Sequence, residues 1–337
     1  MTVILAEPAP DISHATSPQC RSGRVGRPMM SDSKMISDPA ASFKPAPSKL
    51  MTQQKIDRRI KSGRGSGVKE SYVPWIKVWD IKSKGVSHLV LGVKIHRTHH
   101  LISNAERDYL TVLERDNSII DIREQFPLLT QTETQAIANS LNYRHPVYPG
   151  TQIPVVMTTD FLITFIDSSG EVKVAARSVK YRKEFEDAEI GVQNRMAEKL
   201  AIEEKYWAMR QIEWKLVLHE NLSRIKIANL TILRTYASIH PSLPTEKNIV
   251  NLLNFLSRCE TDQVPLKVLL EKASRNIYID YMGVKGLFHH LLWIGRLDMD
   301  LTSKVISLSQ PLHVWISQSP PSVIAPIEVS NNAKSAS

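Results

Sequence analysis

The first 68 residues differ in pattern from the rest of the chain. They are rich in proline, serine, alanine and methionine, and their hydrophobic positions follow no sustained helical or strand period. A basic stretch interspersed with glycines lies near the end of this segment. It is typical of a disordered tail that lies along DNA phosphates, and a solvated linker explains it equally well. The weak DNA-binding candidates in this stretch are Lys55, Arg58, Arg59, Lys61, Arg64 and Lys69.

From Tyr72 onward the hydrophobic pattern predicts an α/β core. Residues 87–101 alternate as strands do, with Leu89, Leu91, Val93 and Ile95 on one face. Residues 104–115 follow the helical period, and Ser103 with Glu106 three residues later forms a capping-box pattern at the helix start. The order of helix, hairpin strands, helix and strand is typical of an α/β fold and not of a helical bundle. The remaining elements predicted in this core are strands at 118–123, 157–166, 172–181 and 214–218 and a long charged helix at 184–210.

A second unit begins near Leu222. Its hydrophobic positions predict several short helices followed by a small hairpin formed by residues 295–297 and 305–307. This order indicates a small, mostly helical domain with a winged-helix-like arrangement. The predicted helices cover 225–238, 246–257, 266–273 and 282–293. The predicted domain organisation is a tail at 1–68, a catalytic core at 69–221, the helical domain at 222–318 and a second tail at 319–337.

Composition and charge narrow the class of protein. A hydrophobic content of 42% is ordinary for a soluble globular protein, and a net charge of +9 favours a polyanionic partner such as DNA. The two cysteines lie far apart, so a zinc ribbon is not expected, and His99 and His100 point to opposite faces of a strand. No stretch approaches the ~20 apolar residues of a transmembrane helix. We therefore expect a soluble protein of the bacterial cytoplasm with no membrane partner.

Three residues stand out as candidates for chemistry. Asp160 interrupts an apolar strand, Lys180 closes the next strand, and Glu106 lies in the first turn of the predicted helix. Carboxylates that hold Mg²⁺, together with a lysine that orients or deprotonates water, are suited to phosphodiester hydrolysis. A cross-strand ion pair between Asp160 and Lys180 is the alternative, and spacing alone favours it.

A series of short motifs changes that balance. In chain order they resemble the TnsA endonuclease subunit of heteromeric cut-and-paste transposases in Tn7-like transposons. The resemblance covers roughly residues 63–218, and its longest run is 121–129. The motifs are Tyr72-Val73-Pro74-Trp75, Ser87-His88, Thr98-His99-His100-Leu101, Asp121-Ile122-Arg123-Glu124-Gln125-Phe126-Pro127-Leu128-Leu129, His145-Pro146-Val147, Thr159-Asp160-Phe161-Leu162 and Tyr206-Trp207.

The resemblance implies a restriction-endonuclease-like core that uses Mg²⁺, or Mn²⁺ in its place, to cut the 5′, non-transferred strand at each transposon end. By position, Glu106 and Asp160 match the family's catalytic acids and metal ligands, and Lys180 matches its catalytic lysine. The backbone carbonyl of Val179 is an expected metal ligand, and Glu203 is an expected accessory acid. Ser178 stands where the family usually carries glutamine, which puts the number of metal ions in question.

The same resemblance implies partners. They are the DNA of the transposon ends, an integrase-like transposase subunit of the TnsB type and an AAA+ ATPase regulator of the TnsC type, with residues 222–318 as the docking and DNA-contact domain. Two alternatives remain open at this stage. One is a catalytically weakened DNA-binding adaptor that bridges transposase and regulator, and Ser178 is the residue that supports it. The other is a stand-alone restriction or repair nuclease.

Overall fold

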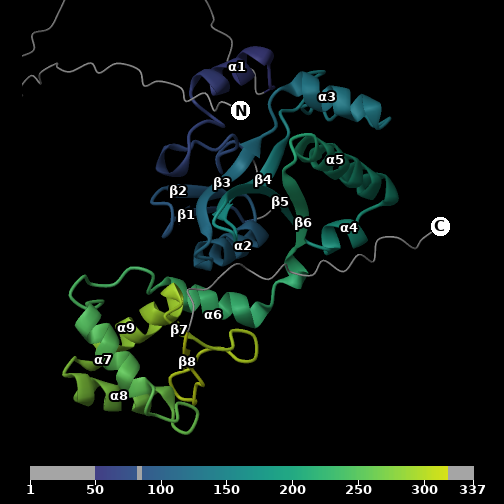
Figure 1. Cartoon of the computed structure of the whole chain (residues 1–337). Helices are drawn as coiled ribbons and strands as arrows, with labels where there is room; N and C mark the ends of the chain where they lie inside the picture. The colour runs from purple at the N-terminus through teal and green to yellow at the C-terminus, as the bar shows by residue number, and fades with distance from the viewer. Residues whose placement is uncertain (1–49, 82–85, 318–337) are drawn as a thin grey trace, which may run out of the picture. The chain divides into compact units, whose positions relative to one another are not determined.

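The computed structural model describes residues 50–81 and 86–317, drawn in colour in Figure 1. The first helix, α1 (Gln53–Lys61), lies inside the segment predicted to be a disordered tail. Its one fully buried residue, Ile56, packs against Trp75 and Val156, so the prediction is wrong from Gln53 onward. The helix is amphipathic, with Ile56 and Ile60 four residues apart, but only Ile56 is buried, because it packs on side chains from distant segments. The rest of the predicted N-terminal tail and the tail at 319–337 lie outside the described residues.

A four-stranded mixed sheet forms the centre of the core (Figure 1). Its strands are β3 (Ile119–Pro127), β4 (Thr158–Ile166), β5 (Val172–Lys180) and β6 (Glu213–Leu218), in that spatial order. The pairs β3–β4 and β4–β5 are antiparallel, whereas β5–β6 is parallel. The predicted α/β core with a mixed sheet is confirmed, and the predicted strands lie within a few residues of those observed.

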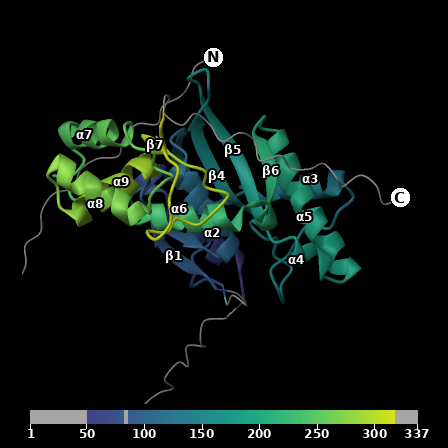
Figure 2. The ribbon, with the colours of Figure 1, turned by 90° about the horizontal axis from the view of Figure 1, so that it is seen from below.

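Helices cover both faces of this sheet, as Figure 2 shows from below. On one face, α2 (Asn104–Arg115) packs against Phe161 and Ile163 of β4. On the other face, α3 (Gln131–Ser140) and α5 (Ile190–Ala208) pack against Leu162 and Ala176. Successive residues of a strand point to opposite faces, so a strand buried on both faces has a continuous apolar run such as 161–163.

The long helix predicted at 184–210 is divided in two. A short helix, α4 (Lys183–Glu186), ends before Asp187, and α5 begins after Glu189. Glu189 has an extended backbone with ψ 148°, which breaks the helical path, and the side-chain amide of Gln193 donates to the carbonyl of Ala188. Charge patterning continues across the break, so the sequence gives no sign of it.

The predicted strands at 87–101 form a separate hairpin of β1 (His88–Leu91) and β2 (Thr98–Leu101), preceded by the 3₁₀ turn η1 (Lys69–Ser71). The expected common face is interrupted. Leu89 and Leu91 are 55% and 69% exposed, whereas Ile95 is buried. The amide of Gly92 donates to the carbonyl of Arg97, which ends β1 and turns the chain before Ile95.

After β6, the short turn η2 (His219–Asn221) leads into a group of helices that share one hydrophobic core. The predicted helices are all present, but the predicted hairpin is wrong. Leu297 and Asp298 (β7) pair with Trp315 and Ile316 (β8) and not with residues 305–307, because the amide of Ile306 is held in a loop by the side chain of Asn229. A winged-helix arrangement therefore stays a prediction. The helices are α6 (Arg224–Arg234), α7 (Glu246–Leu256), α8 (Leu266–Ile277) and α9 (Tyr281–Ile294).

The first of these helices packs directly on the core. All described residues belong to one compact unit, and α6 lies along α2. Nε of Arg234 on α6 lies 2.6 Å from Oε2 of Glu114, a side chain with no solvent exposure at the end of α2. The amide of Val93 donates to the other carboxylate oxygen of Glu114. This ion pair fastens the helical segment to the α/β core.

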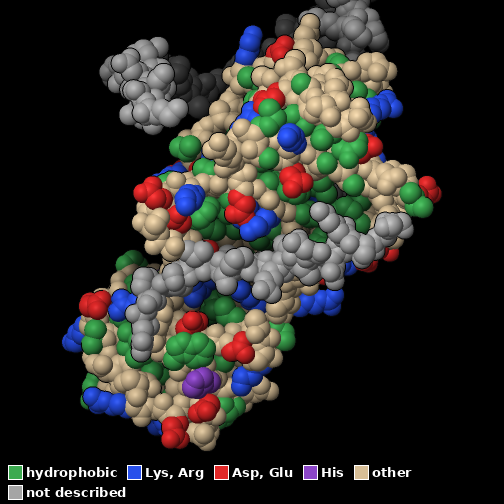
Figure 3. All heavy atoms as spheres, turned by 45° about the vertical axis from the view of Figure 1, so that its right-hand side comes forward, with side chains coloured by type: hydrophobic (Ala, Val, Ile, Leu, Met, Phe, Trp, Pro, Cys, Tyr) green, Lys and Arg blue, Asp and Glu red, His purple; other side chains and the backbone are tan. Residues whose placement is uncertain are grey.

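Over the described parts of the chain, no helix combines the length and the apolar character needed to cross a membrane. On the face drawn in Figure 3, basic and acidic side chains are interspersed and do not form one large patch of a single sign. The net charge of the chain therefore does not locate a DNA-binding surface on that face, and individual basic side chains have to be considered instead.

Candidate active site

Glu106 is fixed in the first turn of α2 by three hydrogen bonds. Its amide donates to the hydroxyl of Ser103, the N-cap residue, at 3.1 Å. In return, the carboxylate accepts from the Ser103 hydroxyl and from the amide of Ile102. The predicted capping pattern is thus present, except that the reciprocal bond goes to the amide of Ile102 and not to that of Ser103. The side chain is only 5% exposed, so its direction is set by the helix start.

Asp160 and Lys180 meet across the β4–β5 hairpin. Nζ of Lys180 lies 2.7 Å from Oδ2 of Asp160, and the same oxygen accepts from the amide of Val179 at 2.8 Å. The Lys180 ammonium also donates to the carbonyl of Val179 at 3.1 Å. The cross-strand ion pair that was the alternative to a catalytic role is therefore present, and Lys180 also contacts the carbonyl of Val179, which the family resemblance implies as a metal ligand.

The electrostatics of these groups are strongly coupled. Burial raises the pKa of Glu106 to about 8, and the nearby charge of Asp160 adds to that shift. Burial lowers the pKa of Lys180, but the charge of Asp160 and its hydrogen bond more than offset this, so the pKa is raised overall. The lysine is consequently a fixed positive charge at neutral pH, whereas Glu106 exchanges its proton in the physiological range.

These donors fit a hard divalent cation. Asp160 repels Glu106 enough to raise the pKa of Glu106, and a cation between them would relieve that repulsion. Within residues 50–81 and 86–317, no group of three or more His, Cys, Asp or Glu side chains could hold a metal ion. Mg²⁺ usually binds through one or two carboxylates, with water and substrate phosphates as further ligands. The two carboxylates and the Val179 carbonyl match that incomplete protein shell.

Ser178 and Glu203 are joined to each other. The hydroxyl of Ser178 donates to Oε1 of Glu203 at 2.6 Å, and the indole N–H of Trp214 donates to the same oxygen at 3.0 Å. The hydroxyl of Thr159 donates there too, and it accepts in turn from the indole of Trp207 at 2.7 Å. Burial raises the pKa of Glu203 to about 7, and the charge of Asp160 contributes.

Gln125 belongs to this site, and the sequence pattern did not single it out. Its side-chain amide donates to Oε2 of Glu106 at 3.1 Å, and the residue is buried. Its backbone is left-handed with φ 50°, which is unusual inside a strand. It lies in the ladder between the pairs Glu124↔Phe161 and Phe126↔Thr159, and so opposite Asp160. The only feature of the sequence that could have pointed to Gln125 is its place within the motif run 121–129.

The basic residues near the N-terminus lie on and after α1, and several already have partners. Arg59 and Arg64 form ion pairs with Asp80, and Lys55 donates to the carbonyl of Leu50. Arg97 donates to the carbonyl of Lys69. Their role in DNA binding stays a prediction, and it now concerns mainly the exposed side chains of Arg58, Lys61 and Lys69.

Two comparisons relate this chain to known proteins. Residues 116–219 match the family model described as the N-terminal domain of TnsA-like endonucleases. The transposition protein TnsA of transposon Tn7 from Escherichia coli is 36% identical over 227 residues, which are 67% of this chain and 74% of that protein. The family match includes Asp160, Ser178, Lys180 and Glu203, and it begins ten residues after Glu106.

Proposed function

Since the chain belongs to the family of TnsA-like endonucleases, we propose that Glu106, Asp160 and Lys180 carry out Mg²⁺-dependent hydrolysis of one DNA strand at transposon ends. The observation that carries the proposal is the convergence of two buried carboxylates, one lysine and one backbone carbonyl at the end of the β4–β5 hairpin. The cut strand is the 5′, non-transferred strand, as the family resemblance implies.

The side chains divide the chemistry between them. Glu106, Asp160 and the Val179 carbonyl would hold the cation, with Mn²⁺ as a substitute for Mg²⁺. The bound cation lowers the pKa of a water molecule and neutralises charge on the phosphate. Lys180 supplies a permanent positive charge beside Asp160, which supports a role in stabilising the phosphate and not in accepting a proton. Gln125 holds Glu106 in place through its amide.

Ser178 was the residue that supported the alternative of an inactive adaptor, and its contacts remove that support. Its hydroxyl donates to Glu203, so its short side chain has a role beside the carboxylates and is not simply a missing metal ligand. We therefore assign Ser178 and Glu203 to the support of the site. Glu203 accepts bonds from β4, β5 and β6, through Thr159, Ser178 and Trp214, and so ties α5 to all three strands.

The partners follow from the same proposal. The chain acts on transposon-end DNA in the bacterial cytoplasm, beside a TnsB-type transposase that cuts the other strand and under a TnsC-type AAA+ regulator. The core, predicted at 69–221 and extended by α1, which packs on it, contains the chemistry, and residues 222–318 form the docking and DNA-contact domain. The ion pair between Arg234 and the buried Glu114 supports a fixed attachment of that domain to the core.

The test is strand-specific cleavage of a transposon-end plasmid in Mg²⁺ with the partner transposase present. Asp160→Ala and Lys180→Ala are expected to abolish the cuts at the 5′ ends. The matched controls are Asp167→Ala and Lys173→Ala, which remove an ion pair at the other end of the same hairpin. Those controls should cut as the wild type does. A wild type that leaves the 5′ ends intact while the partner nicks the 3′ ends would overturn the proposal in favour of the adaptor.

A further inference from the structure

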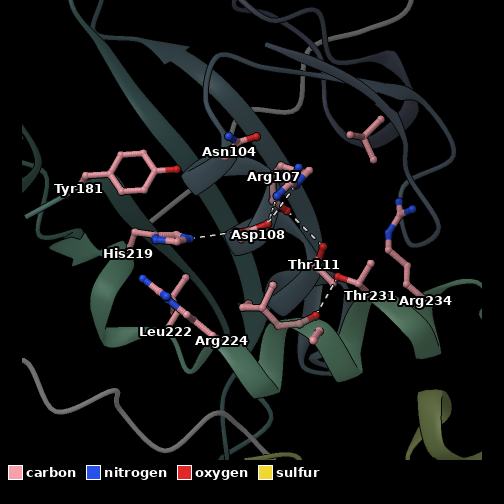
Figure 4. Close-up of a pocket in the computed structure, with 13 residues that line it drawn as sticks. Asn104, Arg107, Asp108, Thr111, Tyr181, His219, Leu222, Arg224, Thr231 and Arg234 are labelled. Atoms are coloured by element: carbon pink, nitrogen blue, oxygen red, sulfur yellow. Dashed lines mark hydrogen bonds and ion pairs between the residues drawn. The ribbon is translucent and has the colours of Figure 1, made fainter. Parts of the chain in front are cut away.

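A cleft of about 800 Å³ lies between α2 and α6, as the close-up in Figure 4 shows. Two of the residues that line it, Asn104 and Arg107, flank Glu106 on α2. A third, Tyr181, directly follows Lys180 at the end of β5. Three residues of the cleft are therefore close neighbours in the chain of Glu106 and Lys180, but Glu106, Asp160 and Lys180 themselves do not line it.

The lining of this cleft is basic. Three arginines, Arg107, Arg224 and Arg234, and one aspartate, Asp108, face it. Arg234 is already paired with the buried Glu114, so these three cations and two carboxylates leave a formal charge of +1 with His219 neutral. Asp108 is already occupied, since it accepts from Arg107 at 2.7 Å and lies 2.9 Å from Nε2 of His219. Its charge thus serves to orient two basic groups at the edge of the cleft.

Arg224 is the most available of these cations. It is exposed in the first turn of α6, and among residues 50–81 and 86–317 no hydrogen bond or ion pair of its guanidinium is found. Figure 4 shows it on the same side of the cleft as His219. Arginine presents a planar fork of donors that matches phosphate oxygens, and an arginine without a carboxylate partner is suited to that use.

The dimensions suit a backbone strand. The 11 residues of α6 make a wall roughly 16 Å long, which is the axial rise of about four to five nucleotides on one strand. Tyr181, at the end of β5, and Asn104, on α2, add a hydroxyl and a side-chain amide to the lining of the cleft. Such groups commonly contact phosphate and sugar oxygens beside arginines.

We propose that the cleft between α2 and α6 binds the sugar-phosphate backbone of DNA next to the phosphate that is cut. The inference rests on the proposed nuclease function and adds the path of the substrate strand. It gives the C-terminal helices a part in every cut, because α6 supplies one wall of the cleft and Arg224. An acidic segment of a partner protein is the competing occupant, and the experiment separates the two.

The experiment measures binding of the full chain to a fluorescent duplex of about four helical turns by anisotropy, in EDTA and over a series of salt concentrations. Arg224→Gln removes the free cation, and Thr231→Glu places a carboxylate on the exposed wall of α6. The matched control is Arg275→Gln, an exposed arginine on α8 outside the cleft. All three variants change the net charge by the same amount, so they differ only in where the charge is changed.

The expected result is a several-fold weaker affinity for Arg224→Gln and a greater loss for Thr231→Glu. The slope of log affinity against log salt should shrink by about 0.9 in Arg224→Gln, because one phosphate is no longer neutralised by the protein. Arg275→Gln should match the wild type. Equal effects in all three variants, or a wild type that does not bind the duplex, would overturn the proposal. So would unaltered DNA binding combined with weaker capture of the partner transposase, because the cleft would then take a protein.

Binding in EDTA does not depend on catalysis, so failure of the two proposals can be told apart. If the cleft variants lose DNA affinity but the wild type makes no 5′ cut with its partner, the proposed nuclease function fails and the DNA path stands. If the wild type cuts the 5′ ends and the cleft variants bind DNA as the control does, the proposed nuclease function is retained and the proposed DNA path through the cleft is wrong.

Discussion

The hydroxyl group of Ser178 donates a hydrogen bond of 2.6 Å to Oε1 of Glu203, which joins β5 to α5 beneath the catalytic pair. The same oxygen of Glu203 accepts from Trp214 and Thr159. A serine at this position therefore completes a buried network. A larger polar residue at position 178 would have to be accommodated within this buried network.

Ser178→Ala should weaken the fold more than the chemistry. Removing one donor from a buried carboxylate costs on the order of 1–2 kcal/mol, and it raises the pKa of Glu203 further because this bond lowers that pKa. We expect a lower free energy of unfolding in urea, with 5′ cleavage preserved. Ser169→Ala, in the exposed turn of the same hairpin, serves as the control. Loss of cleavage at unaltered stability would make Ser178 a metal ligand instead.

The stability of the metal-free protein should fall as pH rises. Glu106 has its pKa raised from an ordinary 4.5 to about 8, so the folded state holds a proton that the unfolded chain releases between these values. Its contribution is fully present below pH 4.5 and is lost as pH rises through about 8. Denaturant unfolding at several pH values in EDTA measures this. Glu106→Gln should make the decline shallower, and Glu203, whose pKa is raised to about 7, accounts for part of the decline that remains. An identical decline in that variant contradicts the assignment.

Mg²⁺ should reverse that trend. A cation binds the deprotonated carboxylates, so its affinity rises with pH and its binding stabilises the folded state. We expect Mg²⁺ to raise the melting temperature more at about pH 8, the pKa of Glu106, than two pH units below it, and to do so far less in Asp160→Ala. An increase of equal size at both pH values would mean that the cation binds elsewhere.

Glu124 has the opposite dependence on pH. Burial alone would raise its pKa, but hydrogen bonds from Arg97 and His99 lower the pKa to about 2. This stabilisation is present above the ordinary value of 4.5 and is lost as pH falls through about 2. Glu124→Gln should cost about 3 kcal/mol, because it leaves the buried Arg97 without its anion. The variant should also unfold at nearly the same denaturant concentration across the acid range, whereas the wild type loses stability there.

A double-mutant cycle can measure the coupling free energy of the ion pair between Arg234 and Glu114, which joins the helical segment to the core. Arg234→Met leaves Glu114 buried without its cation and should cost about 3 kcal/mol of unfolding free energy. Adding Glu114→Gln should recover part of that loss, because the stranded charge is removed. Additive effects of the two substitutions would show that the pair is not coupled.

Local patterns explain why part of this protein was predictable. The apolar strand around Asp160 and the capping pattern at Glu106 are properties of neighbouring residues, and both lead to the site. The contact between Glu114 and Arg234 joins residues 120 positions apart. The local pattern of hydrophobic and polar residues does not predict it. The left-handed backbone of Gln125 depends on how β3 and β4 pair, which one strand alone does not determine. In the same way, Ile56 is buried only because Trp75 and Val156 meet over it.

The parallel pairing of β5 and β6 places Lys180 opposite Leu218, and Leu218 is the last residue of its strand. All four strands of the central sheet are therefore complete before α6 begins. The η2 turn is then a junction at which a different C-terminal module could be grafted without cutting a single ladder of that sheet. Such a chimera has two requirements, because the acceptor core presents a buried anion at Glu114 and an apolar surface on which Leu222 and Ile227 now pack. An incoming module has to offer a cation where Arg234 now lies and apolar side chains beside it, and compatible modules can be recognised by that combination.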